Sequence, residues 1–240
     1  MCGAMTRPDY GVDAPGVIRG LTLGGLAGVV LAAASLWLAS RWPAIGLLVV
    51  GAVLLAEAGL MRRYALHGKF RHRDRILGRV QWQGDEHVLD VGTGRGLLLI
   101  GAAKRLAGGK AVGIDIWNAR DLSGNAIDGT RANLTAEGVA DRCELRSDPA
   151  QDMAFADASF DVVVSNLCLH NIASGAERDR ACRHIARVLK PGGVALVSDL
   201  MHVRSYARAF RAAGLATEID GPYLWDVFPP LNIVIARKPA

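Results

Sequence analysis

The sequence predicts an α/β domain with a mostly parallel sheet, preceded by two transmembrane helices. Three observations predict it: short β-runs alternate with helix-like segments from about residue 73 onward, a strand meets a helix at the glycine-rich stretch 88–96, and two long apolar runs fill residues 17–61. Such alternation is typical of a parallel sheet with helices on both faces. We expect a flexible tail (1–16), a two-helix hairpin (17–61), a basic linker or helix (62–82) and one α/β domain (83–240).

Length and composition agree with this division. The 240 residues suffice for one sizeable domain and a smaller unit. The mean hydropathy of +0.21 is high for a soluble protein and indicates an unusually apolar segment. The four cysteines, Cys2, Cys143, Cys168 and Cys182, have no C-x-x-C spacing. We therefore predict neither a metal site nor a disulfide framework, which fits a reducing cytosolic compartment.

The two apolar runs are long enough to cross a membrane. Residues 17–40 cover the bilayer core of about 30 Å at about 1.5 Å per residue. Pro43 permits a turn, and only Glu57 is charged in the second run, 44–61. A secretory signal peptide is the alternative for the first run, but a second run follows it and we find no convincing cleavage site. The sequence therefore predicts a transmembrane hairpin.

Small and aromatic residues suggest how this hairpin packs. Gly20, Gly24 and Gly28 recur every four residues and could let the two helices approach closely, although simple filling by small residues explains them equally well. Trp37 and Trp42 flank the predicted turn, where interfacial aromatic side chains lie.

A basic stretch follows the second run. Seven Lys and Arg residues lie between positions 62 and 79, against Arg41 alone in the turn, although the net charge of the chain is only +5. The positive-inside rule then places both termini in the cytoplasm of a multi-pass protein of the inner membrane. The stretch could bind anionic lipid headgroups or nucleic acid. We favour lipid because it abuts a predicted span and has few aromatic residues, and we expect His67 and His72 on its surface.

The stretch VLDVGTGRG, residues 88–96, has the pattern of a strand, a tight turn and a helix start. Gly92, Gly94 and Gly96 let the chain turn sharply and leave no Cβ between the backbone and a ligand. The dinucleotide fingerprint G-x-G-x-x-G has its third glycine one residue later, which argues against NAD. The next apolar run ends in Asp115, where an acid of such a unit binds ribose hydroxyls.

Three motifs in this order, VLDVGTGRG (88–96), VGIDIW (112–117) and LKPGGVALVSDL (189–200), resemble the class I S-adenosylmethionine (SAM)-dependent methyltransferases. The resemblance covers about residues 66–240. SFDVVVSNLCLHNI (159–172) resembles the branch that methylates quinone-like and other small molecules. The resemblance implies a Rossmann-like, seven-stranded, mostly parallel sheet with an antiparallel last strand, and SAM as the cofactor.

The resemblance also implies the residues that hold the cofactor. Asp90 would orient its methionine end, although a turn-stabilising role is the alternative, and Asp115 would accept both ribose hydroxyls. Ile116 and Trp117 would enclose the adenine, although a buried Trp is more often core. The full set of candidate cofactor-binding residues is Asp90, Gly92, Thr93, Gly94, Gly96, Asp115, Ile116, Trp117, Asp148, Asn166 and Leu167.

His170 is the candidate catalytic residue. In open α/β sheets, ligands bind outside the carboxyl ends of the strands, which places His170 at the reaction cleft. A neutral imidazole there could act as general base for a hydroxyl or phenol acceptor. The alternative is that His170 caps a helix or lines the pocket without moving a proton. Asp199 could touch substrate or cap a loop, and Tyr206 is a weaker candidate.

These features predict a membrane-anchored SAM-dependent methyltransferase that acts on a small, lipophilic acceptor at the cytoplasmic side. Nucleic acid is not an expected partner. One alternative is a methyltransferase of a membrane-associated protein or peptide, and another is a non-catalytic SAM-binding scaffold. The intact glycine turn and Asp115 argue against the scaffold.

Overall fold

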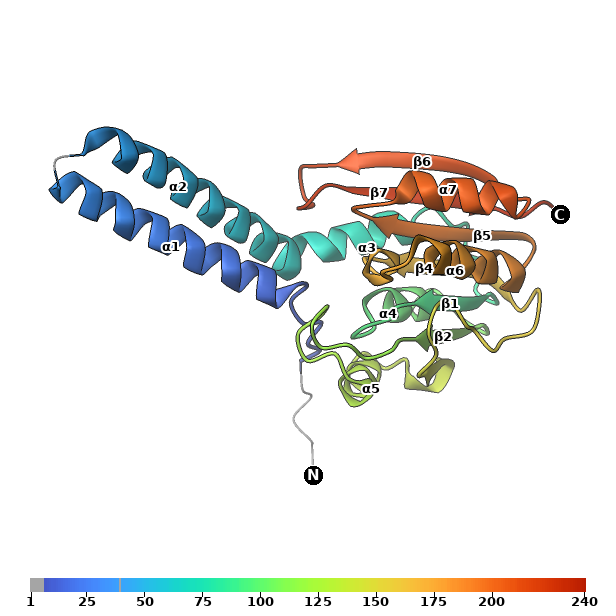
Figure 1. Ribbon diagram of the computed structural model, residues 1–240. Helices are drawn as coiled ribbons and strands as arrows, with labels where there is room; N and C mark the ends of the chain where they lie inside the picture. Colours follow the sequence, from blue (N-terminus) through green and yellow to red (C-terminus); the bar gives the residue numbers. More distant parts are fainter. Residues whose placement is uncertain (1–6, 39) are drawn as a thin grey trace, which may run out of the picture.

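A long helical hairpin projects from one side of an α/β domain (Figure 1) in the computed structural model, which describes residues 7–38 and 40–240. The hairpin consists of α1 (Pro15–Trp37) and α2 (Arg41–Arg63). Helix α2 continues through a π-helical turn (Tyr64–Gly68) into α3 (Lys69–Leu77). Residues 41–77 therefore form one continuous helix of 37 residues that leads from the hairpin into the domain.

The domain contains a seven-stranded sheet of order β3-β2-β1-β4-β5-β7-β6. Its strands are β1 (His87–Val91), β2 (Lys110–Ile114), β3 (Cys143–Arg146), β4 (Phe160–Asn166), β5 (Leu189–Asp199), β6 (Ala216–Tyr223) and β7 (Leu231–Arg237). Strands β1 to β5 pair in parallel, and β7 is antiparallel to both of its neighbours. The predicted Rossmann-like sheet with an antiparallel last strand is confirmed, whereas β6 was not predicted as a separate strand.

Helices cover both faces of the sheet: α4 (Leu97–Ala103), α5 (Ile127–Ala136), α6 (Gly175–Val188) and α7 (Val203–Ala212). Successive strand residues point to opposite faces. Val162 and Val164 of β4 accordingly pack with α3 and α4, whereas Val163 packs with α6 and α7. Two buried hydrophobic cores hold the sheet in place, so its carboxyl edge is a rigid support for a site.

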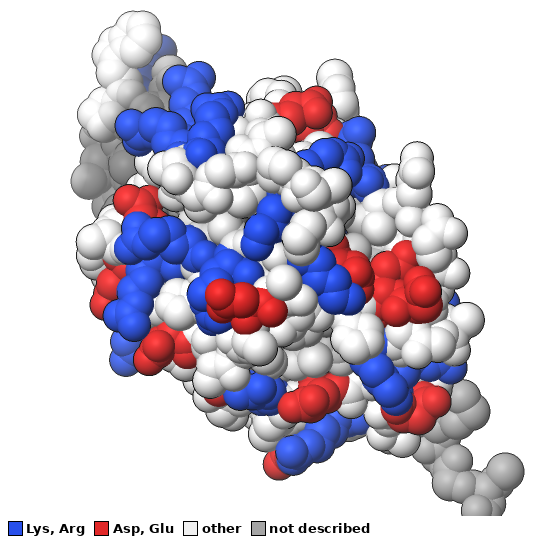
Figure 2. All heavy atoms as spheres, turned by 90° about the vertical axis from the view of Figure 1, so that its right-hand side faces the viewer, with Lys and Arg blue, Asp and Glu red and all other residues white. Residues whose placement is uncertain are grey.

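The carboxyl edge of the sheet faces the hairpin, as the strand arrows in Figure 1 show. Figure 2 shows the opposite side of the molecule, where Lys and Arg side chains are interspersed with Asp and Glu. This face therefore presents no single-sign patch. The features that matter for function gather instead between the sheet edge and the base of the hairpin.

The two hairpin helices approach closely at glycines, but not at all of the predicted ones. A Cβ on Gly51 would lie 2.9 Å from the carbonyl oxygen of Gly25, and one on Gly28 would lie 3.1 Å from the Cα of Gly51. A Cβ on Gly20 would meet no atom of the described residues within 4 Å. The close approach expected at positions 20, 24 and 28 thus lies at 25, 28 and 51.

The outward surface of the hairpin is apolar. Trp37 and Trp42, at the tip, are 87% and 84% exposed, and many Leu and Val side chains along both helices are exposed as well. Pro43 lies in the first turn of α2, where a missing N–H is tolerated. Both helices are long and apolar enough to cross a membrane by length and composition.

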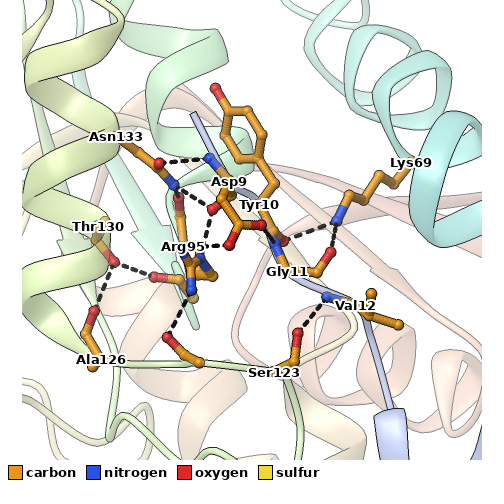
Figure 3. A network of polar contacts seen from close by, with 12 residues as sticks. Asp9, Tyr10, Gly11, Val12, Lys69, Arg95, Ser123, Ala126, Thr130 and Asn133 are labelled. Carbon is orange, nitrogen blue, oxygen red and sulfur yellow. Dashed lines mark hydrogen bonds and ion pairs between the residues drawn. The ribbon is translucent and has the colours of Figure 1, made fainter. Parts of the chain in front are cut away.

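The N-terminal segment differs from the expected flexible tail. Residues 9–14 are bound to the domain by hydrogen bonds (Figure 3), in which the Lys69 ammonium donates to the carbonyl oxygens of Tyr10 (2.8 Å) and Gly11 (2.5 Å). Asp9 exchanges backbone hydrogen bonds with the Asn133 amide, and the segment forms a β-bridge with Leu122. Residues distant in the sequence thus provide hydrogen-bond partners for the backbone of this segment. Residues 1–6 of the predicted tail lie outside the described residues.

Fewer basic side chains of the stretch 62–79 are available to a binding partner than its sequence indicates. Lys69 is buried, Arg75 forms an ion pair with Asp226 (2.8 Å), and Arg79 pairs with Asp220. The exposed Lys and Arg side chains of this stretch are those of Arg62, Arg63, Arg71 and Arg79, and Arg79 is held by Asp220. The part of the stretch that could meet lipid headgroups is therefore smaller than predicted.

His72 was predicted on the surface, and this prediction is wrong. The side chain is fully buried, and its Nε2 lies 2.7 Å from the Ser198 hydroxyl. Burial lowers the pKa of His72 to about 4, and the nearby Arg75 charge acts in the same direction. His72 is therefore a neutral core residue that joins α3 to β5.

Candidate active site

A large cavity lies at the carboxyl edge of the sheet and extends to the base of the hairpin. Its volume is about 1060 Å³. Glycine-turn residues and Asp115 line one side, and Val17, Leu21 and Met61 of the hairpin helices line the other. Pockets for one ligand usually measure roughly 300–1,000 Å³. The volume of the cavity therefore lies at the upper end of this range.

The glycine turn gives this cavity a wall of bare backbone. Gly92, Gly94 and Gly96 have φ of 73°, 52° and 84°, a region that side chains disfavour. A Cβ on Gly92 would also lie 2.2 Å from the Cys168 sulfur. Gly92, Thr93 and Gly94 line the cavity, whereas Gly96 does not line it and starts helix α4.

Asp90 lies beneath the turn and has the turn-stabilising role that was the alternative for it. Its carboxylate accepts hydrogen bonds from the Thr93 hydroxyl (2.8 Å) and from the Leu99 backbone N–H (2.9 Å), so it stabilises the turn. It also lines the cavity. Burial raises the pKa of Asp90 to about 7, so its charge is sensitive to whatever lies beside it.

Asp115 lines the cavity at the end of β2. Its carboxylate accepts from the backbone N–H groups of Gly94 (2.8 Å) and Trp117 (2.6 Å) and from the Asn125 amide (3.2 Å). A carboxylate offers about four acceptor positions. One position is thus open to a ligand hydroxyl, and a second becomes available if the long bond from Asn125 gives way.

The structure adds Asn125, which sequence reasoning missed, to the candidate residues. Its side chain is buried, lines the cavity and contacts Asp115. Its Oδ1 atom is buried and has no hydrogen-bond partner within residues 7–38 and 40–240. The only signal in the sequence was the polarity of the long connection after Trp117, which does not single out one residue.

The predicted adenine neighbours are only partly brought together. Ile116 and Asp148 line the cavity, but Trp117 does not. The backbone of Trp117 has φ of 57°, and its indole N–H donates to the Ser147 hydroxyl at 2.8 Å. The indole is therefore bonded to Ser147, and of the two predicted adenine neighbours only Ile116 lines the cavity.

Asn166 and Leu167 line the cavity at the end of β4, as does His170 in the short helix Leu169–Asn171. His170 Nδ1 lies 2.7 Å from Oδ1 of Asp199, whose side chain is fully buried at the end of β5. Sequence reasoning proposed both residues separately and missed the pair.

Further donors hold the Asp199 carboxylate in place. It accepts hydrogen bonds from the backbone N–H groups of His170 (3.1 Å) and Leu200 (2.8 Å) and from the Tyr206 hydroxyl (3.3 Å). His170 Nδ1 lies at ion-pair distance from this carboxylate but makes no hydrogen bond within residues 7–38 and 40–240, so the pair places the imidazole at the cavity without fixing its tautomer. A neutral imidazole in this position is a candidate general base. In the part of the chain that the structure describes, no three His, Cys, Asp or Glu side chains cluster as metal ligands do.

The strand order, the glycine turn after β1 and the acid after β2 define a Rossmann-like domain that binds a nucleoside-containing ligand. Residues 89–197 match the family model described as "Methyltransferase domain". The chain thus carries a class I SAM-dependent methyltransferase domain, and SAM is the cofactor of this class of enzyme.

Individual relatives agree with this assignment. The probable methyltransferase ltbC of Aspergillus luteorubrus is 28% identical over 166 residues, which cover 64% of this chain and 56% of that protein. A demethylmenaquinone methyltransferase of Symbiobacterium thermophilum is 33% identical over 123 residues, 51% of this chain and 45% of that protein. The chain thus spans about half the length of these curated relatives.

Among solved structures, a SAM-dependent methyltransferase from Aquifex aeolicus superimposes with a TM-score of 0.55 at 16% identity, over 69% of this chain and 88% of that one. At this identity the similarity concerns the fold alone.

Proposed function

We propose that the protein is a membrane-anchored methyltransferase that transfers a methyl group from SAM to a small, lipophilic acceptor on the cytoplasmic side. The observation that carries the proposal is the continuity of the cavity, which joins the glycine turn and Asp115 to His170 and to the base of the apolar hairpin. A demethylmenaquinone methyltransferase among the relatives, whose name states a quinone-type acceptor for that protein, supports a small acceptor.

The residues of the cavity fit the cofactor. Gly92 and Gly94 line the cavity with backbone, and a Cβ on either would clash with Cys168 or Leu122. The buried Asn125 oxygen has no partner among the described residues. Asp115 would accept a ribose hydroxyl, and Asp90 lies where a cationic group would favour its ionised form. When bound, SAM supplies a methyl group that its sulfonium already activates.

The remaining work of the protein is positioning, exclusion of water and proton removal. Holding two reactants in line can contribute about 7–11 kcal/mol to lowering a barrier. His170 would accept the acceptor's hydroxyl proton at Nε2, and Asp199 would stabilise the resulting imidazolium from the Nδ1 side.

Membrane anchoring is supported by the shape and composition of the hairpin. Two helices of 23 residues each expose apolar side chains that no other described element covers. Arg62 and Arg63 at the end of α2, together with Arg71, are exposed where anionic headgroups would meet the domain. The excess of basic residues after the second helix favours a cytoplasmic domain.

Calorimetric titration of SAM into the full chain tests the cofactor site. We expect binding that Asp115→Ala abolishes or weakens by at least about tenfold, because the variant loses a charged acceptor. Asp128→Ala, whose side chain is 87% exposed, is the matched control and should bind as the wild type does. No binding of SAM to the wild type would contradict the proposal.

Methyl transfer from labelled SAM separates the remaining alternatives. The full chain is incubated with a membrane lipid extract, a soluble extract and a membrane protein fraction. We expect label in the lipid extract. Label in protein alone would favour the protein or peptide methyltransferase, and SAM binding without label in any fraction would favour the scaffold.

Reporters fused to Ala240 and inserted at Arg41 test the orientation of the protein in the membrane. A C-terminus outside the cytoplasm would contradict the proposed orientation.

A further inference from the structure

The cavity has a second half that the SAM-binding elements do not build. This half is lined by Asp13 before α1, Val17 and Leu21 of α1, Glu57 and Met61 of α2, and Tyr64 of the π-helical turn. All six residues precede the segment that matches the methyltransferase family model, residues 89–197. The hairpin base and the N-terminal segment thus add a wall to the cavity that lies outside the matched methyltransferase segment.

The upper part of this wall is apolar. Val17, Leu21 and Met61 line the cavity, and Val17 is 54% exposed. These apolar lining residues belong to the same two helices as the exposed apolar side chains of the hairpin. A hydrocarbon group in the cavity would remain in contact with apolar side chains up to the membrane side of the domain.

The lower part of the wall carries buried polar atoms without partners. Asp13 Oδ2 and the Tyr64 hydroxyl are buried and meet no hydrogen-bond geometry within the described ranges 7–38 and 40–240, although the Asn166 side chain lies close enough to Tyr64 to lower its pKa. The Lys69 ammonium, 4.0 Å from Asp13 Oδ2, already donates to the carbonyls of Tyr10 and Gly11. A buried polar group without a partner is destabilising, so this region favours a ligand with a polar group.

The polar atoms also indicate which kind of polar group fits. Asp13 Oδ2 and the Asn166 Oδ1 atom, which is likewise buried and unpartnered among the described residues, are hydrogen-bond acceptors. Burial raises the pKa of Tyr64, and the nearby Asp13 carboxylate acts in the same direction, so Tyr64 stays a neutral phenol. Two acceptors and one hydroxyl call for a ligand that donates a hydrogen bond.

We propose that the N-terminal segment and the hairpin base form the acceptor subsite, which takes an amphiphilic molecule with a hydroxyl head group at Asp13 and Tyr64 and an apolar body along Val17, Leu21 and Met61. This inference rests on the proposed methyltransferase function. It assigns the hairpin a direct part in acceptor binding in addition to anchoring.

The test uses two probes of matched size, 2-naphthol and 2-methylnaphthalene, which differ in the hydroxyl group. Each is titrated into the full chain in detergent, and binding is followed by the fluorescence of the probe. We expect 2-naphthol to bind the wild type more tightly. Tyr64→Phe and Asp13→Asn should each weaken 2-naphthol by about three- to tenfold and leave 2-methylnaphthalene within about twofold.

Leu21→Trp tests the apolar wall, because the larger side chain fills the space of the ligand. It should weaken both probes by at least about tenfold. Leu31→Trp is the matched control on the same helix, since Leu31 is 55% exposed and does not line the cavity. Unchanged affinity in Leu21→Trp, equal loss of both probes in Tyr64→Phe, or no binding of 2-naphthol to the wild type would overturn the inference.

SAM calorimetry on the same samples separates the two proposals. Variants that bind SAM within about twofold of the wild type are correctly folded, so a change in probe binding then reports on the subsite. A wild type that binds 2-naphthol in the expected pattern but does not bind SAM would contradict the methyltransferase proposal and leave the hydroxyl subsite supported.

Discussion

At the scale of single residues, Asp90 links the charge of the cavity to pH. Burial raises its pKa to about 7, far above the ordinary range of an aspartate. Between about pH 4 and pH 7 the folded protein therefore keeps a proton that the unfolded chain has lost. The stability that this proton contributes is present at low pH and falls as the pH rises toward 7.

The same pKa predicts how SAM affinity depends on pH. SAM carries positive charge, so it should bind the ionised form of Asp90 better. We expect its affinity to rise about fivefold between pH 6 and pH 7, which is the change in ionised fraction for such a group. Asp90→Asn keeps the shape and should flatten this profile. Calorimetry at several pH values measures it, and an equal slope in both proteins would rule out Asp90 as the cause.

The His170–Asp199 pair carries the second prediction at this scale. Asp199→Asn should lower kcat for methyl transfer by about 10²- to 10⁴-fold, because the imidazole loses the carboxylate that orients it and stabilises its charge. SAM affinity should stay within about twofold. Tyr206→Phe, which removes only a 3.3 Å hydrogen bond to Asp199, should cost less than about tenfold. A kcat in Asp199→Asn close to that of the wild type would show that His170 moves no proton.

Sequence reasoning found the residues of this pair but not their contact. His170 and Asp199 are far apart in the chain and meet because β4 and β5 are neighbours in the sheet. Trp117 shows the opposite case, since its motif predicted an adenine contact and its hydrogen bond to Ser147 turns the indole away. Side-chain direction depends on such tertiary partners, which a linear motif does not contain.

At the scale of elements, strands with an apolar core pattern were predictable and β6 was not. Strands β1 and β4 are recognisable in the sequence because both are largely apolar runs between polar turns. Strand β6, ATEIDGPY, lies at the edge of the sheet, and all its residues are at least partly exposed. Its polar sequence therefore lacks the hydrophobic pattern that identifies a buried strand.

The packing of α1 against α2 predicts a local effect of glycine substitution. Gly51→Ala places a Cβ 2.9 Å from the Gly25 carbonyl oxygen and should destabilise the hairpin by about 1–3 kcal/mol. Gly46→Ala is the control on the same helix, since a Cβ there meets no described atom within 4 Å. Thermal unfolding in detergent compares them, and equal midpoints would show that the helices do not touch at Gly51.

The N-terminal segment gives the second prediction for elements. Lys69→Met leaves the carbonyls of Tyr10 and Gly11 without their donor, which should loosen residues 9–14 by about 1–3 kcal/mol. Lys110→Met, whose ammonium bonds the Asp141 carbonyl at the surface, is the matched control. Hydrogen exchange at residues 9–14 should accelerate only in Lys69→Met. Unchanged exchange would mean that other contacts hold the segment.

At the scale of the whole molecule, two findings connect the hairpin with the domain. The N-terminal segment before α1 is bonded to the domain, and α2 runs without interruption into α3, whose side chains enter the core. The sequence predicted a hairpin followed by a domain but treated the parts between them as a flexible tail and a basic linker. Both segments have a defined structure because Lys69, Asn133 and Arg75 bond to residues that are distant in the sequence, and no local sequence pattern reveals such bonds.

The continuous helix from Arg41 to Leu77 has a consequence for any bilayer in which the hairpin sits. A flexible tether would let a domain rotate and rise freely, but an unbroken helix transmits the tilt of the hairpin to the domain. The opening of the cavity would then keep a constant height and orientation relative to the lipid surface. Such an enzyme selects its substrates partly by depth, since only groups that reach that one level in the bilayer can be modified.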